Sequence, residues 1–209
     1  MRAHRLITTC ALAIVGVAGW ACNSDSVTGG SRGTVVVRLT DAPFPTDSVD
    51  SVNVFVVRVD ARMTAADSAA ADSAEANASA GGWITLASPG RVYNLMALRN
   101  GIFAALDTTE VTAGNYSAVR LVIDPSRSRV VLKNGMVLSG NTSPSVSFPS
   151  GSTSGIKVNL AGGLNVVAGD TTSLLLDFDL DQSFVLRGNS IAQLGLLFKP
   201  VIIATVTIN

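Results

Sequence analysis

Three aspartates at alternate positions are the residues whose spacing best suits a metal site. Asp177, Asp179 and Asp181 would lie on one face of an extended strand, with neighbouring carboxylates roughly 7 Å apart. Like charges so placed repel one another unless a cation or basic side chains lie between them. Calcium is the metal that prefers carboxylate and carbonyl oxygens. A straight strand cannot surround an ion, so Asp170 or the aspartates of 41–50 would have to contribute. We expect either a calcium site or a solvated acidic face.

Histidine is missing from almost the whole chain, since His4 is the only one. Beyond that position the chain cannot build a Ser-His-Asp or Cys-His catalytic site, or a zinc, copper or iron site with histidine ligands. Acid–base catalysis would fall to carboxylates, Lys or Tyr. It would need a cleft in which Asp177 or Asp179 faces Asp41 and one carboxyl has a raised pKa. We assign no catalytic residue and expect a protein that is not an enzyme, with calcium as the one candidate cofactor.

The charge distribution disfavours nucleic acids and nucleotides as partners. The 209 residues include 15 basic and 15 acidic side chains, and the three lysines, at 133, 157 and 199, are scattered. A nucleic-acid-binding protein usually shows a basic cluster, and the Gly- and Ser-rich loops lack the lysine of a phosphate-binding loop. The apolar fraction of 47% predicts a packed core instead.

The first 21 residues have the layout of an export signal. Arg2 and Arg5 precede the uncharged, mostly apolar segment Leu6–Gly19. A positive start followed by a short apolar stretch is typical of a secretory signal, and this stretch is short for a membrane span. We expect residues 1–21 to be removed. Their removal takes away Arg2 and Arg5, which leaves 13 basic against 15 acidic residues.

A cysteine follows the expected cleavage point. Gly19-Trp20-Ala21-Cys22 resembles a bacterial lipobox, in which the cysteine thiol receives a diacylglycerol. Gly19 and Trp20 depart from the usual pattern, because an aliphatic and a small residue are more common there. We expect lipidation of Cys22, with a flexible Ser- and Gly-rich tether over residues 22–32. Ordinary cleavage after Ala21 and an uncleaved membrane anchor are the alternatives.

The rest of the chain shows the two-residue periodicity of strands. Apolar and polar residues alternate in Thr34–Thr40, Val49–Arg62 and 174–181. A bulge near Val56-Val57 would reconcile the two alternating halves of the second of these strands, and burial of both of its faces is the simpler alternative. Short strands without amphipathic helices between them predict an all-β fold, an antiparallel β-sandwich of immunoglobulin- or transthyretin-like type, as one domain over residues 33–209.

Local signals predict three further features. Asn134-Gly135 indicates a two-residue hairpin turn. Tyr116 follows Gly114, so its hydroxyl is expected to bond to the backbone at a sheet corner, as in other sandwiches. Residues 64–82 are a low-complexity Ala/Ser/Asp stretch with no large apolar side chain to bury, and we expect an exposed loop insertion there.

These segments together resemble a known family. VRLTDAP at 37–43, the Val-rich strand at 49–59, YNLMALRNG at 93–101, AGNYSAVRLVID at 113–124 and LLLDFDLDQS at 174–183 occur in this order. With the lipobox-like start, they resemble the exported bacterial and archaeal domain of unknown function 4382, over about residues 33–205. The resemblance implies a β-sandwich on a cell-surface lipoprotein and no particular activity.

The functional expectation is a non-catalytic, lipid-anchored binding or structural module of the cell envelope, facing the periplasm or the exterior. Its partners would be the membrane, through the lipid, and a glycan or an envelope protein. A carbohydrate-binding module is one alternative and predicts exposed rings near Trp83 or Tyr93. A calcium-stabilised adhesion domain is the other.

Overall fold

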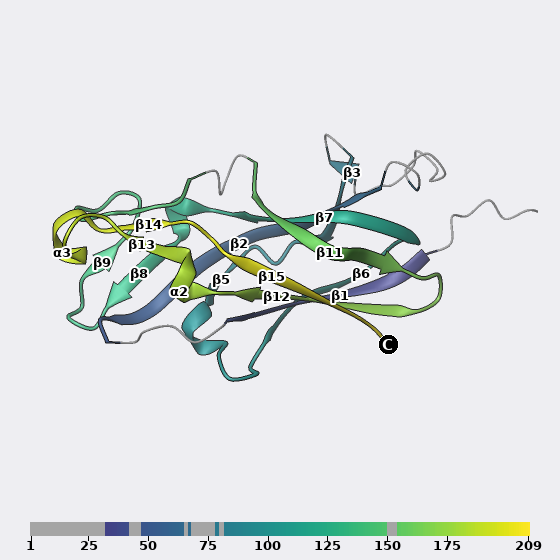
Figure 1. Cartoon of the computed structure of the whole chain (residues 1–209), viewed down its shortest axis with the longest axis horizontal. Helices are drawn as coiled ribbons and strands as arrows, with labels where there is room; N and C mark the ends of the chain where they lie inside the picture. The colour runs from purple at the N-terminus through teal and green to yellow at the C-terminus, as the bar shows by residue number, and fades with distance from the viewer. Residues whose placement is uncertain (1–31, 42–46, 65–66, 68–77, 80–81, 150–153) are drawn as a thin grey trace, which may run out of the picture.

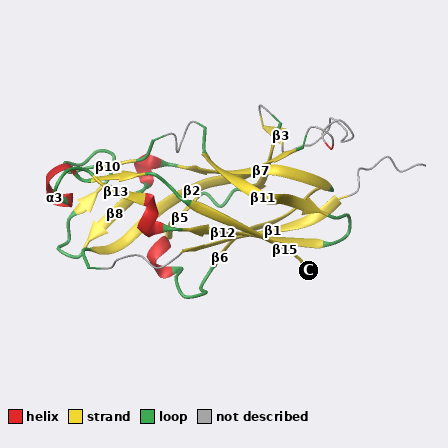
Figure 2. Ribbon diagram, viewed as in Figure 1, coloured by secondary structure: helices red, strands yellow, loops and turns green. Residues whose placement is uncertain are grey.

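The computed structural model describes residues 32–41, 47–64, 67, 78–79, 82–149 and 154–209. The predicted signal, Cys22 and the tether up to residue 31 lie outside the described residues, as does most of the 64–82 stretch. Strands dominate the described chain (Figure 2). The expected all-β class is therefore confirmed, while the immunoglobulin- or transthyretin-like type stays a prediction.

The strands form three sheets, and the two larger ones lie as layers along the long axis (Figure 1). Sheet A has the order β15 (Ile202–Ile208), β12 (Thr171–Phe178), β1 (Arg32–Asp41) and β6 (Ala104–Thr112). Sheet B has the order β11 (Ile156–Val166), β7 (Gly114–Ile123), β2 (Val49–Met63), β4 (Trp83–Ala87) and β3 (Ala78–Ser79). Two further strands, β5 (Arg91–Asn94) and β8 (Arg129–Leu132), also pair with β2, and β9 (Val137–Leu138) pairs with β8.

The small sheet C lies at one end of the molecule. It has the order β10 (Val146–Ser147), β14 (Leu196–Phe198) and β13 (Phe184–Leu186). The short helices η1 (Leu95–Ala97), η2 (Pro125–Arg127), α2 (Leu180–Ser183) and α3 (Ile191–Leu194) have one turn each. β3 falls inside the predicted insertion and pairs with β4.

The expectation of purely antiparallel sheets is wrong at two places. β1 pairs in parallel with β12, and β10 pairs in parallel with β14. Parallel neighbours need a long crossover, and the chain from β2 to β11 supplies one between β1 and β12. The alternation of apolar residues is the same in both kinds of pairing, so the sequence pattern does not distinguish them.

The core lies between sheets A and B and contains the apolar faces predicted from the alternation. Val35, Val37 and Leu39 of β1 are fully buried, and so are Leu174 and Leu176 of β12. Burying such side chains stabilises the fold by about 1.5–3 kcal/mol each. These faces hold the ends of β1 and β12 side by side, which positions the acidic residues that follow.

Two local predictions are confirmed and one is wrong. Tyr116 is fully buried and its hydroxyl donates to the Thr112 carbonyl oxygen at 2.7 Å. The β2–β7 register shifts between Val56 and Arg58, as the predicted bulge requires. The β8–β9 hairpin exists, but its turn holds three residues, because the Leu132 amide bonds to Met136 and only Gly135 has a positive φ, 83°.

Candidate functional site: an end cavity and a buried acidic cluster

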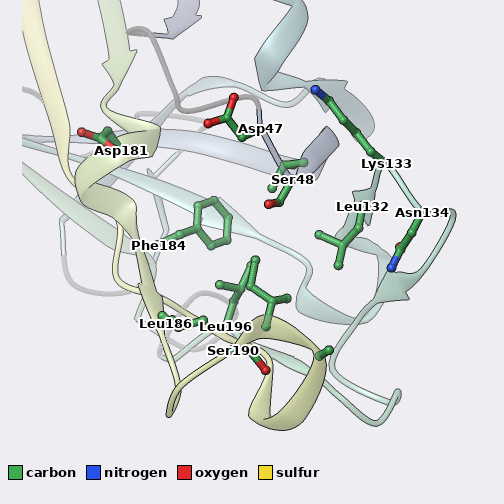
Figure 3. Close-up of a pocket in the computed structure, with 13 residues that line it drawn as sticks. Asp47, Ser48, Leu132, Lys133, Asn134, Asp181, Phe184, Leu186, Ser190 and Leu196 are labelled. Carbon is green, nitrogen blue, oxygen red and sulfur yellow. The ribbon is translucent and has the colours of Figure 1, made fainter.

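An open cavity of about 820 Å³ lies at the end of the molecule that carries sheet C (Figure 3). It is lined by Asp47, Ser48, Val49, Leu132, Lys133, Asn134, Asp181, Phe184, Leu186, Ser190, Ile191, Ala192 and Leu196. The apolar side chains form the walls, while Lys133 and Asn134 lie on one side and Asp181 on the opposite side (Figure 3). Apolar walls with a few polar groups at the mouth are typical of ligand sites.

Aromatic packing supports the wall of the cavity formed by sheet C. The Phe184 ring lies 5.0 Å from that of Phe198, which is itself packed between Phe148 at 5.1 Å and Phe178 at 6.3 Å. Tilted and stacked aromatic pairs at these distances are favourable beyond the area they bury. Phe184 is therefore held in place from the core side, and its position does not depend on a ligand.

Exposed apolar side chains lie in the elements that frame the cavity. Val185 and Leu186 on β13 are 44% and 45% exposed, Leu194 on α3 is 57% exposed, and Val137 on β9 is 43% exposed. Large exposed apolar groups that gather in one region often mark an interaction site. This end of the molecule thus combines an apolar cavity with neighbouring apolar surface.

The acidic ends of β1 and β12 form a second candidate site, next to the elements that line the cavity. Thr40 is the register partner of Asp177, and Asp41 that of Phe178. The Thr40 hydroxyl bonds to the carbonyl oxygens of Leu98 and Ile102, both at 2.8 Å. Segments 37–43, 93–101 and 174–183, which carry the family resemblance, therefore meet here.

Asp41 is buried without a matching partner. It is 4% exposed, and among the described residues no group hydrogen-bonds to either of its carboxylate oxygens. Burial, with a smaller contribution from the Asp177 charge, raises its pKa to about 7 against the opposing effects of the Leu180 amide and the Arg99 guanidinium. The pKa of Asp177 is raised too, by burial and by the Asp179 charge. Both carboxyls therefore take up a proton more readily than an exposed aspartate does.

The proximity and the raised pKa that carboxylate catalysis would need are present at Asp41 and Asp177, but the end cavity is not lined by them. A general acid must lie within hydrogen-bond reach of its substrate. Within the described part of the structure, neither carboxyl is therefore placed to exchange a proton with a substrate bound in the end cavity.

The three candidate calcium ligands do not share one strand face. β12 ends at Phe178, so only Asp177 belongs to the strand. Asp179 is the N-cap of α2 and accepts from the Gln182 amide at 3.0 Å, and Asp181 is exposed inside that helix. The expected geometry is thus wrong, because capping a helix redirects the chain. Across the described residues, no three His, Cys, Asp or Glu side chains converge on a common point.

The aromatic platform expected of a carbohydrate module is not formed by the two predicted rings. Trp83 and Tyr93 are each only 6% exposed. Arg62 and Arg120 cover the Trp83 ring, at 5.4 and 4.5 Å from its centroid. A sugar-stacking surface needs exposed rings, so these two residues do not supply one.

Sequence reasoning missed the cavity altogether. Its walls come from three segments that lie far apart in the chain, around positions 48, 132 and 190. The apolar runs in each segment are visible in the sequence, but nothing local shows that they meet.

The fold and these sites define a β-rich domain with an open end cavity and no recognisable catalytic arrangement in its described part. The chain belongs to the family described as domain of unknown function DUF4382, whose match covers residues 32–200. No curated protein and no solved structure matches the chain. In the described residues, no helix has the length and apolarity to span a membrane.

Proposed function

We propose that this protein is a lipid-anchored, non-catalytic binding module of the cell envelope, and that its end cavity holds the ligand. The observation that carries the proposal is the open cavity of about 820 Å³, with walls such as Leu132, Phe184 and Leu196. Its apolar walls and charged mouth suit an amphipathic ligand, with an apolar body inside and a polar group at Asp47, Lys133 or Asp181.

The position of the cavity supports an anchored arrangement. β1 begins at Arg32, directly after the predicted tether, at the end of the molecule opposite sheet C (Figure 1). Its ten residues run toward the cavity over roughly 33 Å. A lipid on Cys22 would therefore leave the cavity at the end far from the membrane, where a ligand from the envelope or the exterior could reach it.

Dye binding tests the cavity. The apolar dye N-phenyl-1-naphthylamine becomes fluorescent when it leaves water, and we expect it to bind the purified protein. Leu186→Asp should weaken binding by about tenfold, because it places a charge on the apolar wall. The matched control is Ile203→Asp, since Ile203 is also exposed, at 57%, but lies on β15, away from the cavity. Absence of dye binding, or equal weakening by both changes, would refute a cavity that binds ligands.

Fractionation tests the anchor separately. The full-length chain expressed in a bacterium should sediment with membranes, and mass spectrometry should find a diacylglycerol on Cys22. Cys22→Ser should release the protein into the soluble fraction, whereas Ser24→Ala two residues further on should not. An unmodified Cys22 thiol in the native protein would show that the protein is not a lipoprotein.

The two alternative functions differ in how far the geometry supports them. For calcium, the described residues offer no converging ligand set, so the structure gives this alternative no support. Melting temperatures that coincide in chelator and in excess calcium would end it. A glycan partner stays open, but it cannot depend on the buried rings of Trp83 and Tyr93.

A further inference from the structure

The outer side of sheet B carries basic residues that only folding brings together. On β2, Val59 and Ala61 are fully buried toward the core. Successive side chains of a strand point to opposite faces, so Arg58 and Arg62 lie on the outer side. The sequence shows these arginines as isolated residues in an apolar strand.

The neighbouring strands extend the same surface. On β7, Val119 and Leu121 are fully buried and Arg120 lies between them. On β11, Val158 is buried beside the exposed Lys157. In the sheet register Arg120 pairs with Asp60 on one side and with Lys157 on the other. We call Arg58, Arg62, Arg120 and Lys157 the basic face.

The basic face carries more positive charge than its one carboxylate, Asp60, can neutralise. Asp60 accepts from Arg58 at 3.0 Å and from Arg120 at 2.8 Å, so one carboxylate is shared by two guanidinium groups. Among the described residues neither Arg62 nor Lys157 forms an ion pair, and both are exposed. Like charges that stand on adjacent strands are unfavourable unless something offsets them. An external anion would do so.

Trp83 fixes the direction of two of these cations. The guanidinium groups of Arg62 and Arg120 lie 5.4 and 4.5 Å from its ring centroid. Stacking on an aromatic ring holds the exposed Arg62 guanidinium in place while its N–H groups face the solvent side, whereas Arg120, only 13% exposed and bonded to Asp60, contributes its charge from within that network. The buried tryptophan therefore orders the cations of the basic face before any ligand arrives.

We propose that the basic face binds an acidic polysaccharide. The four cations are spread over three strands of an extended sheet surface. Arg58 and Arg62 are about 13 Å apart along β2, and Arg120 and Lys157 are about 5 Å apart across strands. A flat array of this kind suits a long chain with repeated carboxylate or sulfate groups, to which arginine can bond in a bidentate manner. The choice of a polysaccharide over other polyanions depends on the proposed envelope location.

Salt-dependent binding of the full-length chain, in neutral detergent, tests the proposal with heparin and polygalacturonate as probes. We expect retention on at least one of them at low NaCl and release as salt rises. Arg62→Gln with Lys157→Gln should weaken binding by about tenfold. The charge-matched control is Arg187→Gln with Lys199→Gln, which removes two exposed cations near the end cavity instead, and should leave binding within about twofold of the wild type.

Several results would overturn the proposal. They are no retention of the wild type on either polysaccharide, equal weakening in both double variants, or binding to poly-L-glutamate that is as tight as binding to the polysaccharides. The urea midpoints of both double variants should lie close to that of the wild type, because all four side chains are exposed and the Arg62–Trp83 contact contributes at most about 1 kcal/mol. Dye binding in the end cavity is measured separately, so failure of this proposal and failure of the cavity proposal are distinguishable.

Discussion

Asp60 on sheet B and Asp41 on sheet A are both buried carboxyls, yet the two sheets provide them with very different surroundings. Asp60 is fully buried and accepts bonds from Arg58, Arg120 and the Thr85 hydroxyl, at 3.0, 2.8 and 2.9 Å. Asp41 is 4% exposed and accepts none from the described residues. A buried charge is tolerable when it is paired and bonded, and otherwise the group takes up a proton.

This difference follows from where the two aspartates lie in their sheets. Asp60 is in the middle of β2, between β4 and β7, so both neighbouring strands contribute donors at fixed positions. Asp41 is the last residue of β1, where its neighbour β12 supplies another carboxyl, Asp177, rather than a base. The middle of the sheet therefore holds a satisfied ion network, while the end of sheet A holds a carboxyl pair that favours a proton.

Removal of the satisfied carboxyl should have the largest effect. Asp60→Ala leaves Arg58 and Arg120 side by side without their shared anion, and Arg120 is only 13% exposed. We expect the free energy of unfolding, from urea denaturation, to fall by about 3 kcal/mol. Asp50→Ala is the matched control, because Asp50 is an exposed aspartate on the same strand. Equal losses in the two variants would mean that the Asp60 network does not stabilise the fold.

Removal of the unsatisfied carboxyl should have the opposite sign. The pKa of Asp41 is about 7 in the folded protein, against about 3.9 in an unfolded chain. The folded state therefore binds this proton more tightly, and the free energy of unfolding falls as pH rises from about 4 to about 7. Asp41→Asn mimics the protonated group, so it should stabilise the protein at pH 8, by on the order of 2 kcal/mol, and change little at pH 4.

Melting temperatures at pH 4 and pH 8 measure the effect of Asp41→Asn. Asp50→Asn serves as the control, since it removes an exposed charge without relieving a buried one. The interpretation of Asp41 as an unpaired buried carboxyl would have to be abandoned if Asp41→Asn destabilised the protein equally at both pH values.

The contrast between local and long-range information explains what the sequence could predict. The buried faces of β1 and β12 and the Tyr116 corner were predictable, because alternation and a glycine two residues earlier are local signals. The parallel pairing of β1 with β12 was not, since it depends on the path of the chain between them. The position of Asp179 was predicted wrongly, because the alternation of β12 continues in the sequence past Phe178. The pattern does not show that the strand ends there and that Asp179 caps a short helix.

The candidate sites were harder still to predict from the sequence, because they depend on the register between strands that are far apart in the chain. The Asp60 network needs Arg120 from β7 and Thr85 from β4, and neither stands at a recognisable spacing from Asp60 in the chain. The cavity likewise joins the start of β2 to sheet C. The family segments were recognisable in order, but their meeting around Asp41 appears only when β1 and β12 are placed side by side.

A smaller change examines the third donor of the satisfied site. Thr85→Val keeps the shape of the side chain and removes the hydroxyl that bonds to Asp60 at 2.9 Å. We expect a loss of about 1 kcal/mol in urea denaturation, which is less than for Asp60→Ala because both arginines remain. Thr109→Val, at a β6 position outside this network, is the control. A loss as large as that of Asp60→Ala would show that the hydroxyl, rather than the guanidinium groups, provides most of the stability of this network.

The smallest effect is expected at a carboxyl that is satisfied but near the surface. Asp124 accepts from the Ser126 hydroxyl at 2.6 Å and from Arg127 at 2.7 Å, and these bonds lower its pKa to about 2. A lowered pKa stabilises the folded state above about pH 4, and this contribution is lost as pH falls toward 2. Because Arg127 is 58% exposed, Asp124→Asn should cost no more than about 1 kcal/mol at pH 7. Carbon-13 titration of the Asp41 and Asp124 carboxyls in one sample should give widely separated titration midpoints. Midpoints that coincide would mean that hydrogen-bond partners do not determine the pKa values of the aspartates in this fold.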